Sequence, residues 1–325
     1  MIDAGGGAPD ALDRHETGGV RLKAPRTGAQ GHFWAKDWSW GYGLLLPAIL
    51  AVCLVIVYPM ISLVLESVTT TTSEGFGAAS HSTFVGLANF KALFSDPAFW
   101  TSFRNNLIIL VSVPIRIIIG LFVTQVIYKG IWGSRIYQTL IFLPFVAPVA
   151  SVGIIFIYLL NESGPINGFL NALGLGSLAH GWLTDQNLAM WSISAVVLWS
   201  RLGFTVLLFM ARMLSVDRQI FQAAFVDGAN WRQAYWRVGV PELRRTIEFV
   251  AMLGFIESFS WSFSYVFVLS QGAFQTNSWI LEIYTYSHAF RGITYGLAAA
   301  TAMFLLVIAA LVAAYRFAIQ RRELA

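Results

Sequence analysis

Charged residues are scarce in this chain of 325 residues: Asp, Glu, Lys and Arg together make up 12% of it, whereas 57% is hydrophobic. A soluble globular domain carries about 25% charged residues, so a largely water-exposed surface is excluded and most of the surface is expected to face lipid. The single cysteine, Cys53, cannot form an internal disulfide. No block of basic residues interleaved with aromatics is present, and nucleic acid is therefore not an expected partner.

Motifs of common catalytic sites are also missing. The sequence has no Gly-x-Ser-x-Gly, no His-Glu-x-x-His and no Walker A motif. All of its histidines lie outside the apolar segments described below. These absences predict a chain that is not an enzyme, binds no metal and holds no cofactor or nucleotide itself.

Long apolar runs are what the sequence does contain. A helix needs about 20 residues to cross a bilayer, and six segments reach that length. They span residues 41–66, 104–128, 137–160, 188–213, 247–269 and 293–316. Their length and continuous apolarity exclude barrel strands, so the fold class is an all-α integral membrane protein. Pro144 and Pro148 fall inside the third segment, where they either kink it harmlessly or open a cavity along a subunit interface.

Most basic residues of the loops lie on one side of these spans; on the other side, the 67–103 loop has only Lys91 and the 270–292 loop only Arg291. The 161–187 loop has none, whereas Arg218, Arg232, Arg237, Arg244 and Arg245 lie in the 214–246 loop. The positive-inside rule then places that loop and both termini in the cytoplasm. The expected organisation is a disordered N-terminal tail (1–37), a membrane domain (38–318) that includes the 214–246 loop, and a C-terminal tail (319–325).

The 214–246 loop is amphipathic. Ser215 or Asp217 can cap a first helix, and Gly228 can end it in the left-handed conformation. Asn230 with Gln233 three residues later forms a capping-box pattern for a second helix. Pro241 is expected to break the chain before the next span. The loop therefore predicts two short helices at an angle, with an apolar surface that a protein groove or the membrane interface must bury.

At this point the sequence resembles a known family. Gln222-Ala223-Ala224, then Asp227-Gly228, then Val238-Gly239-Val240-Pro241 match the spacing of the EAA loop of ABC importer permeases, with Gln222 in place of the usual Glu. Residues 84–90 (FVGLANF) resemble an external segment of the carbohydrate class, of maltose and glycerol-3-phosphate type.

The resemblance implies a six-helix, type I ABC importer permease of the bacterial cytoplasmic (inner) membrane that moves a carbohydrate-like solute by alternating access. The implied partners are a second permease in a heterodimer, two ATPase subunits that bind ATP and Mg, and an extracytoplasmic solute-binding protein. The residues implied to couple to an ATPase are Gln222, Ala223, Ala224, Phe225, Asp227, Gly228 and Pro241.

Solute contacts follow from the positions that maltose-type permeases use relative to the EAA motif. The resemblance implies contacts at Leu198, Arg201, Phe204, Gly254, Glu257, Ser258 and Trp261. Polar residues inside a span are costly and are functional candidates. The alternative is an Arg201–Glu257 ion pair that only ties two helices together. Arg116, in the second span, is expected to be structural or to contact the partner permease.

Two other functions fit parts of the sequence. A secondary transporter or channel explains the apolar spans but not the 214–246 loop. An ABC permease for a non-sugar solute explains the loop but not the match at residues 84–90. The carbohydrate importer permease accounts for both features.

Overall fold

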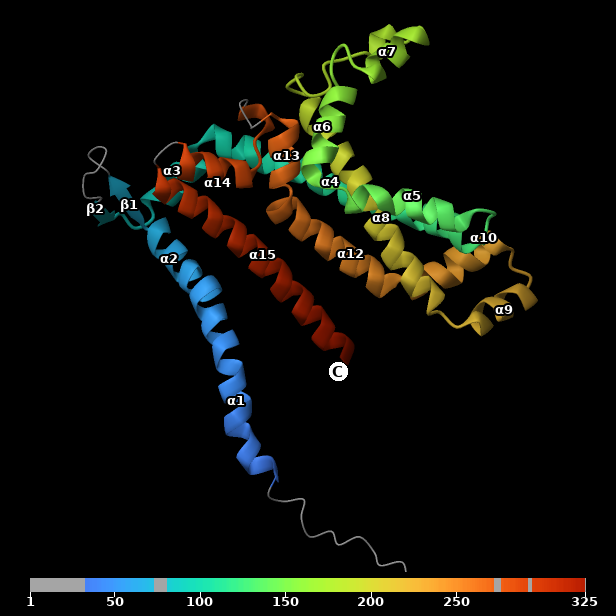
Figure 1. The fold of residues 1–325 in the computed structure, drawn as a ribbon, viewed down its shortest axis with the longest axis horizontal. Helices are drawn as coiled ribbons and strands as arrows, with labels where there is room; N and C mark the ends of the chain where they lie inside the picture. The colour runs from blue at the N-terminus through green and yellow to red at the C-terminus, as the bar shows by residue number, and fades with distance from the viewer. Residues whose placement is uncertain (1–32, 73–80, 272–275, 292–293, 325) are drawn as a thin grey trace, which may run out of the picture. The chain divides into compact units, whose positions relative to one another are not determined.

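The computed structural model describes residues 33–72, 81–271, 276–291 and 294–324, which form helices and one two-stranded hairpin (Figure 1). Contacts divide the chain into two units, Met1–Tyr58 and Pro59–Ala325. Each unit is described by itself.

The first unit contributes one long helical segment. Helix α1 covers Phe33–Val52, and η1 is a π-helical turn at Cys53–Val57. Helix α2 (Tyr58–Ser67) begins at the last residue of this unit and otherwise belongs to the second unit. Helix therefore begins inside the predicted tail 1–37, of which residues 1–32 lie outside the described residues. The stretch Gly43–Ser67 is long and apolar enough to cross a membrane, and its residues 43–58 are all exposed.

The second unit holds the remaining elements. They are β1 (Thr69–Thr72), β2 (His81–Phe84), α3 (Ala88–Ser95), α4 (Pro97–Tyr128), α5 (Ser134–Val146), α6 (Val149–Leu159), α7 (Pro165–Ala172), η2 (Gly176–Leu178), α8 (Ala189–Leu214), α9 (Arg218–Val226), α10 (Trp231–Ala234), η3 (Tyr235–Gly239), α11 (Val240–Glu242), α12 (Arg244–Ile256), η4 (Glu257–Trp261), α13 (Phe263–Leu269), η5 (Thr276–Ser278), α14 (Leu281–Phe290) and α15 (Tyr295–Leu324). Strands β1 and β2 pair antiparallel, with Thr69 opposite Phe84.

Four helical segments of the described chain could each span a bilayer: Gly43–Ser67, Pro97–Tyr128, Ala189–Leu214 and Tyr295–Arg316. The third and fifth predicted spans are each a pair of helices, bent by 99° between α5 and α6 and by 53° before α13. The predicted six-helix class is thus confirmed when each bent pair counts as one span. Helix α15 continues to Leu324, through most of the predicted C-terminal tail.

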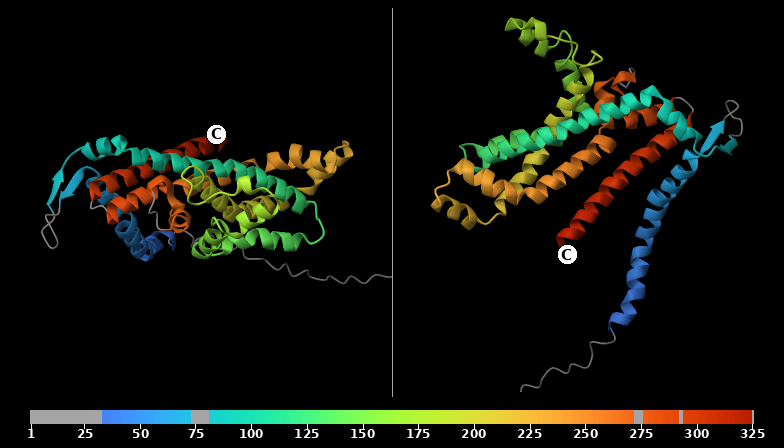
Figure 2. Two further views of the ribbon diagram at one scale, coloured as in Figure 1. Left: turned by 90° about the horizontal axis from the view of Figure 1, so that it is seen from above. Right: turned by 180° about the vertical axis from the view of Figure 1, so that it is seen from behind.

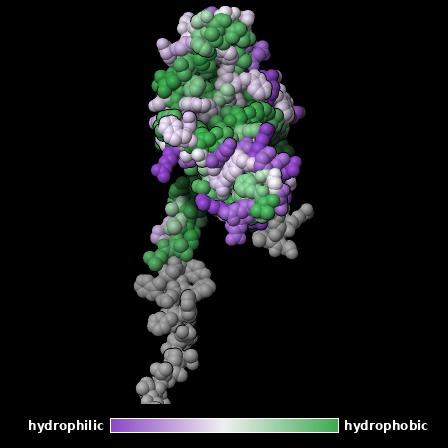
Figure 3. All heavy atoms as spheres, turned by 90° about the vertical axis from the view of Figure 1, so that its right-hand side faces the viewer, coloured by the Kyte–Doolittle hydropathy of each residue, from purple (hydrophilic) through white to green (hydrophobic). Residues whose placement is uncertain are grey.

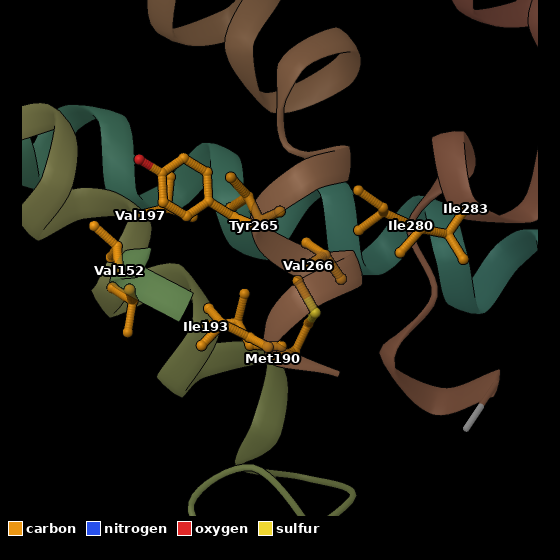
Figure 4. Packing of buried hydrophobic residues seen from close by; sticks show 11 residues of the cluster. Val152, Met190, Ile193, Val197, Tyr265, Val266, Ile280 and Ile283 are labelled. Atoms are coloured by element: carbon orange, nitrogen blue, oxygen red, sulfur yellow. The ribbon is translucent and has the colours of Figure 1, made fainter. Parts of the chain in front are cut away.

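The 99° bend lies at Ala147–Pro148. Ala147 is extended, as the residue before a proline prefers, and Pro148 caps α6. Pro144 stays inside α5. The bend turns α6 onto α13, where a side-chain carbon at Gly153 would meet Val268. Around this contact lies an apolar cluster that α6, α8, α13 and α14 share (Figure 4).

Helices α4 and α8 pack together along the second unit, and α5 packs on α8 (Figure 2). Glycine makes both contacts close. A carbon added at Gly120 would lie 2.9 Å from Thr205, and one added at Gly203 would strike the backbone of Ile141 and Phe142. Small residues let membrane helices approach closely enough for van der Waals packing, so these helices have one tight arrangement.

Candidate functional site

The 214–246 loop begins with a capped helix. The Asp217 carboxylate accepts a hydrogen bond from the Gln219 backbone amide at 2.9 Å, which caps α9. The Ser215 hydroxyl instead donates to the Arg212 carbonyl at 2.7 Å, at the end of α8. Of the two predicted caps, Asp217 is therefore the one that starts α9.

The end of α9 follows the predicted pattern. Gly228 has a φ of +83°, which L side chains adopt only with strain, and the Ala229 amide donates back to the Ala224 carbonyl at 2.9 Å. The Asn230 side chain then accepts from the Gln233 amide, while the Gln233 side chain accepts from the Asn230 amide. The predicted capping box is confirmed, and it fixes the angle between α9 and α10.

Pro241 does not break the chain, contrary to the sequence-based prediction. It lies in the first turn of α11, directly after the π-helical turn η3, and the helical path continues into α12. The first turn of a helix tolerates proline because its missing amide hydrogen is not needed there. The loop is thereby joined to the fifth span by almost uninterrupted helix.

An aromatic seat holds the loop onto the spans; we use this name for Tyr128, Phe221, Trp231 and Tyr235. The Trp231 ring stacks on Tyr128 and Phe221, with centroids 5.7 and 6.3 Å away. The buried Tyr235 hydroxyl donates to the Leu121 carbonyl of α4 at 2.8 Å, and burial raises the pKa of this phenol. The sequence analysis missed Tyr235, because its partner lies 114 positions away.

Gly239 brings the loop close to α8. A side-chain carbon there would lie 2.5 Å from the Met213 terminal methyl and 3.2 Å from the Phe221 ring. A side chain at position 239 would require Met213 and Phe221 to move, so the Val238-Gly239-Val240-Pro241 motif has a packing role in this fold.

The outer face of α9 is unpacked. Val226 is 87% exposed and Ile220 40%. Phe225 is 43% exposed, but one side of its ring stacks on Trp231 at 6.2 Å. The other predicted coupling residues that are exposed are Gln222, Ala223, Asp227, Gly228 and Pro241. Ala224 is half-buried toward the seat. Hydrophilic residues gather on this end of the second unit (Figure 3), so the apolar tip of α9 is a small patch in a polar surround.

The predicted intramembrane residues meet at η4, where the fifth span bends. Glu257 opens this π-helical turn, and its carboxylate lies 2.9 Å from the Arg116 guanidinium of α4 and 3.8 Å from the Arg201 guanidinium of α8. The predicted Arg201–Glu257 pair exists, and Arg116, expected to be structural or at the partner permease, is the nearer partner. Two cations and one anion leave this cluster with a net positive charge.

The remaining predicted solute contacts divide into two groups. The first group is packed against the junction. A side-chain carbon added at Gly254 would lie only 2.9 Å from the Arg116 guanidinium, and the buried Ser258 hydroxyl donates to the Gly254 carbonyl at 2.8 Å. Trp261, in contrast, is 61% exposed. Leu198 and Phe204 on α8 are half-buried. Phe204 stacks on Phe145 at 4.8 Å, and the Arg201 guanidinium lies over that same Phe145 ring at 5.7 Å.

A polar group next to this cluster was missed from the sequence. The Asn106 amide of α4 donates to the Ser258 carbonyl at 2.6 Å and to the Glu282 carboxylate at 3.0 Å, and its oxygen accepts from the Leu281 amide at 2.8 Å. Burial raises the pKa of Glu282 to about 7, although the Asn106 hydrogen bond acts in the opposite direction. The one signal in the sequence was Asn106 itself, a polar residue near the start of the second apolar segment and so a candidate for a buried polar contact. We call Asn106, Arg116, Arg201, Glu257 and Glu282 the polar junction.

No group of three or more metal-binding side chains occurs within the described residues. The site therefore offers hydrogen bonding, charge and aromatic surface along the spans and a protein-docking face at α9.

Comparisons with known proteins agree with this geometry. Residues 116–323 match the family described as binding-protein-dependent transport system inner membrane component. A probable ABC transporter permease of Pyrococcus horikoshii is 32% identical over 233 residues, covering 70% of this chain and 79% of the relative. The sn-glycerol-3-phosphate transport system permease UgpA of Yersinia enterocolitica is 30% identical over 250 residues, with 75% and 82% covered.

A third relative, the multiple sugar-binding transport system permease MsmF of Streptococcus mutans, is 27% identical over 288 residues, covering 88% of this chain and 96% of the relative. Among solved structures, a chain of a bacterial alginate ABC transporter in complex with an alginate pentasaccharide-bound periplasmic protein superposes with a TM-score of 0.74. That match is 22% identical, covers 89% of this chain and 96% of the other, and supports the fold alone. The described apolar helices and the family match together show that the chain belongs to the inner-membrane permeases of binding-protein-dependent ABC importers, which are multi-pass subunits without catalytic activity of their own.

Proposed function

We propose that this chain is one permease half of an importer for a carbohydrate-like solute, namely a sugar, oligosaccharide, polyol or glycerol phosphate. Relatives at 27% and 30% identity are named for multiple sugars and for sn-glycerol-3-phosphate. Residues 84–90 carry the external segment that resembles this class.

The coupling part of the proposal rests on one observation, the exposed tip of α9 on a packed aromatic seat. An apolar tip with an 87% exposed Val226 gains free energy when a partner covers it. Asp217 caps the start of α9 and Gly228 terminates it, while Tyr235 and Gly239 of η3 pack the following part of the loop against α4 and α8. A force on the tip therefore reaches the spans rather than bending the loop.

The same spans carry the polar junction. Helix α4 holds Leu121 under the seat and Arg116 further along, while α8 holds Met213 and Arg201. Movement of α9 would shift the arginines relative to Glu257 and so change the solute path. Coupling needs nucleotide and solute to favour different states, and this arrangement supplies a packed connection between the two sites.

The finer arrangement belongs to the same proposal. Two ATPase subunits bind ATP and Mg beneath a heterodimer of this chain and a second permease, and an extracytoplasmic solute-binding protein delivers solute. The 214–246 loop and both termini face the cytoplasm, in agreement with the distribution of Arg and Lys.

Co-purification of the ATPase subunit tests the docking face. We expect Val226→Asp to release the ATPase, because the charge would have to be buried in the interface, while the membrane domain keeps its thermal unfolding midpoint. Leu173→Asp, at a 57% exposed site on the predicted external side, is the matched control and should retain the ATPase. Retention of the ATPase by Val226→Asp would refute the docking assignment.

Solute-stimulated ATPase activity of the reconstituted complex tests the solute contacts. We expect Arg201→Ala and Trp261→Ala to raise the solute concentration needed for half-stimulation. An unchanged solute dependence in both variants would remove these residues from the solute path.

A further inference from the structure

The proposed function leaves unexplained a cavity of about 480 Å³ at the loop end, behind α9. It opens between α9 and the ends of α4, α5 and α8. Its lining includes the apolar side chains Ile127, Met210 and Leu214 and the basic side chains Lys129 and Arg218. The lining of the cavity therefore combines apolar side chains with two cations.

The position of the cavity matches the edge of a bilayer. The spans formed by α4 and α8 end at Tyr128 and Leu214, so the three apolar lining residues belong to the spans and both cations follow them in the chain. Trp132, in the following turn, is 95% exposed, and tryptophan is enriched at the level of lipid headgroups. Apolar lining residues at the ends of the spans and basic lining residues just after them suit a phospholipid more than an acidic protein segment.

The charge of the cavity is not balanced by the chain. Lys129 and Arg218 are exposed, and neither forms a salt bridge within the described residues. The lining contains no carboxylate, because Gln222 stands at the motif position where the family usually has Glu. The Trp231 indole N–H, also in the lining residue set, is buried without a hydrogen-bond acceptor among the described atoms.

From these observations we propose that the cavity binds an anionic phospholipid of the cytoplasmic leaflet. The headgroup phosphate lies between Lys129 and Arg218, and the acyl chains lie along Ile127, Met210 and Leu214. Basic pockets between transmembrane helices on the cytoplasmic side are suited to anionic headgroups. The lipid would fill the space between α9 and the spans. Gln222 favours this binding, because the Glu usual at this motif position would place a carboxylate near the phosphate and repel it. The cytoplasmic placement rests on the proposed function.

Native mass spectrometry of the purified complex, taken from nanodiscs of phosphatidylcholine and phosphatidylglycerol, tests the proposal. Each basic residue near a membrane surface contributes about a fivefold preference for anionic lipid. The double variant Lys129→Gln/Arg218→Gln should therefore retain about 25-fold less phosphatidylglycerol relative to phosphatidylcholine, the product of two such factors. Gln222→Glu should also lower retention. Arg135→Gln is the matched control, since Arg135 is exposed at the same end but outside the cavity, and it should retain the lipid.

Three outcomes would overturn the proposal. The first is equal retention of phosphatidylglycerol by the double variant and the wild type. The second is displacement of the lipid by excess inorganic phosphate, which would make the site one for free anions. The third is loss of the ATPase from the double variant in nanodiscs of phosphatidylcholine alone, which would assign the cavity to an acidic protein segment.

Failure of the proposed function gives a different result. A wild-type chain that purifies without any ATPase contradicts the docking of α9. Lipid retention is measured on the chain itself and does not depend on that result.

Discussion

The 214–246 loop and the polar junction are assembled from contacts of very different range. In the loop, the bonds that set the helix ends join residues two to five positions apart, such as Asp217 with Gln219. At the polar junction, Arg116 reaches Glu257 across 141 positions, and Asn106 reaches Glu282 across 176. The ends of the loop helices are therefore set by neighbouring residues, whereas the junction forms only after four helices have packed.

The two regions also differ in their exposure to water. The tip of α9 is exposed and carries apolar residues, while the ion pairs of the junction are largely buried, with side-chain exposures of 6% to 17%. Charges removed from water are stable only when paired and hydrogen-bonded. Errors at the junction should therefore be costly for the whole fold, and errors in the loop should be confined to docking and local order.

The largest effect is expected at Glu257. Glu257→Gln leaves Arg116 and Arg201 close together without a counter-charge, and breaking a buried pair in this way costs about 3–5 kcal/mol. The thermal unfolding midpoint of the detergent-solubilised complex should fall, as should the amount of inserted protein. Glu242→Gln is the control, because its pair with Arg212 is about half exposed and is worth under about 1 kcal/mol. Equal losses from both variants would contradict the contrast between the regions.

The second largest effect is a pH dependence that originates at Glu282. Burial raises the pKa of its carboxyl from 4.5 to about 7, so the folded state binds the proton more tightly than the unfolded state. Stability is then fully present below pH 4.5 and is lost as the pH rises through 7, by roughly 3 kcal/mol for a shift of this size. Unfolding midpoints between pH 5 and 8 should show the decline in the wild type.

Glu282→Gln provides the matched test, since an amide resembles the protonated acid but does not titrate. We expect its midpoint to vary less with pH than that of the wild type over this range. Parallel pH profiles for the two proteins would mean that Glu282 does not carry the effect.

The sequence predicted the loop better than the junction, and the range of the contacts explains this. The Asp217 cap, the Gly228 helix end and the Asn230–Gln233 capping box are each encoded within a few residues. Hydropathy likewise located the spans, because apolarity is summed along a single segment. Local patterns were sufficient wherever local forces decide the structure.

Bends and long-range partners were harder to predict. The sequence placed Pro148 inside a span, but the 99° angle depends on the packing of α6 against α13 through Gly153. The Arg201–Glu257 pair could be predicted because each is a charged residue in an otherwise apolar span. Nothing local indicates that Arg116 lies nearer to Glu257, and the prediction that Pro241 breaks the chain overlooked its place in the first turn of a helix. The assigned solute contacts remain predictions.

A smaller effect is expected where the loop meets the spans. Tyr235→Phe removes the hydrogen bond to the Leu121 carbonyl and should cost about 1 to 2 kcal/mol, because a buried acceptor loses its donor. Hydrogen exchange in η3 and α9 should become faster while the spans keep their protection. Tyr137→Phe, at an exposed site in α5, is the control and should leave exchange unchanged. Faster exchange throughout α4 as well would contradict this prediction, because it would mean that the aromatic seat stabilises the spans and not only the loop.

The smallest effect is expected within the loop itself, at Asn230. Asn230→Ala removes the side-chain acceptor from the Gln233 amide and should cost about 1 kcal/mol, the usual value of an N-cap. The change should appear as faster hydrogen exchange at the start of α10, while the unfolding midpoint of the complex hardly moves. Asn230→Ser keeps a capping oxygen and should restore protection. If Asn230→Ala instead lowered the unfolding midpoint as much as Glu257→Gln, the loop and the junction would unfold as one cooperative unit. The contrast between a loop set by neighbouring residues and a junction assembled from distant ones would then be wrong.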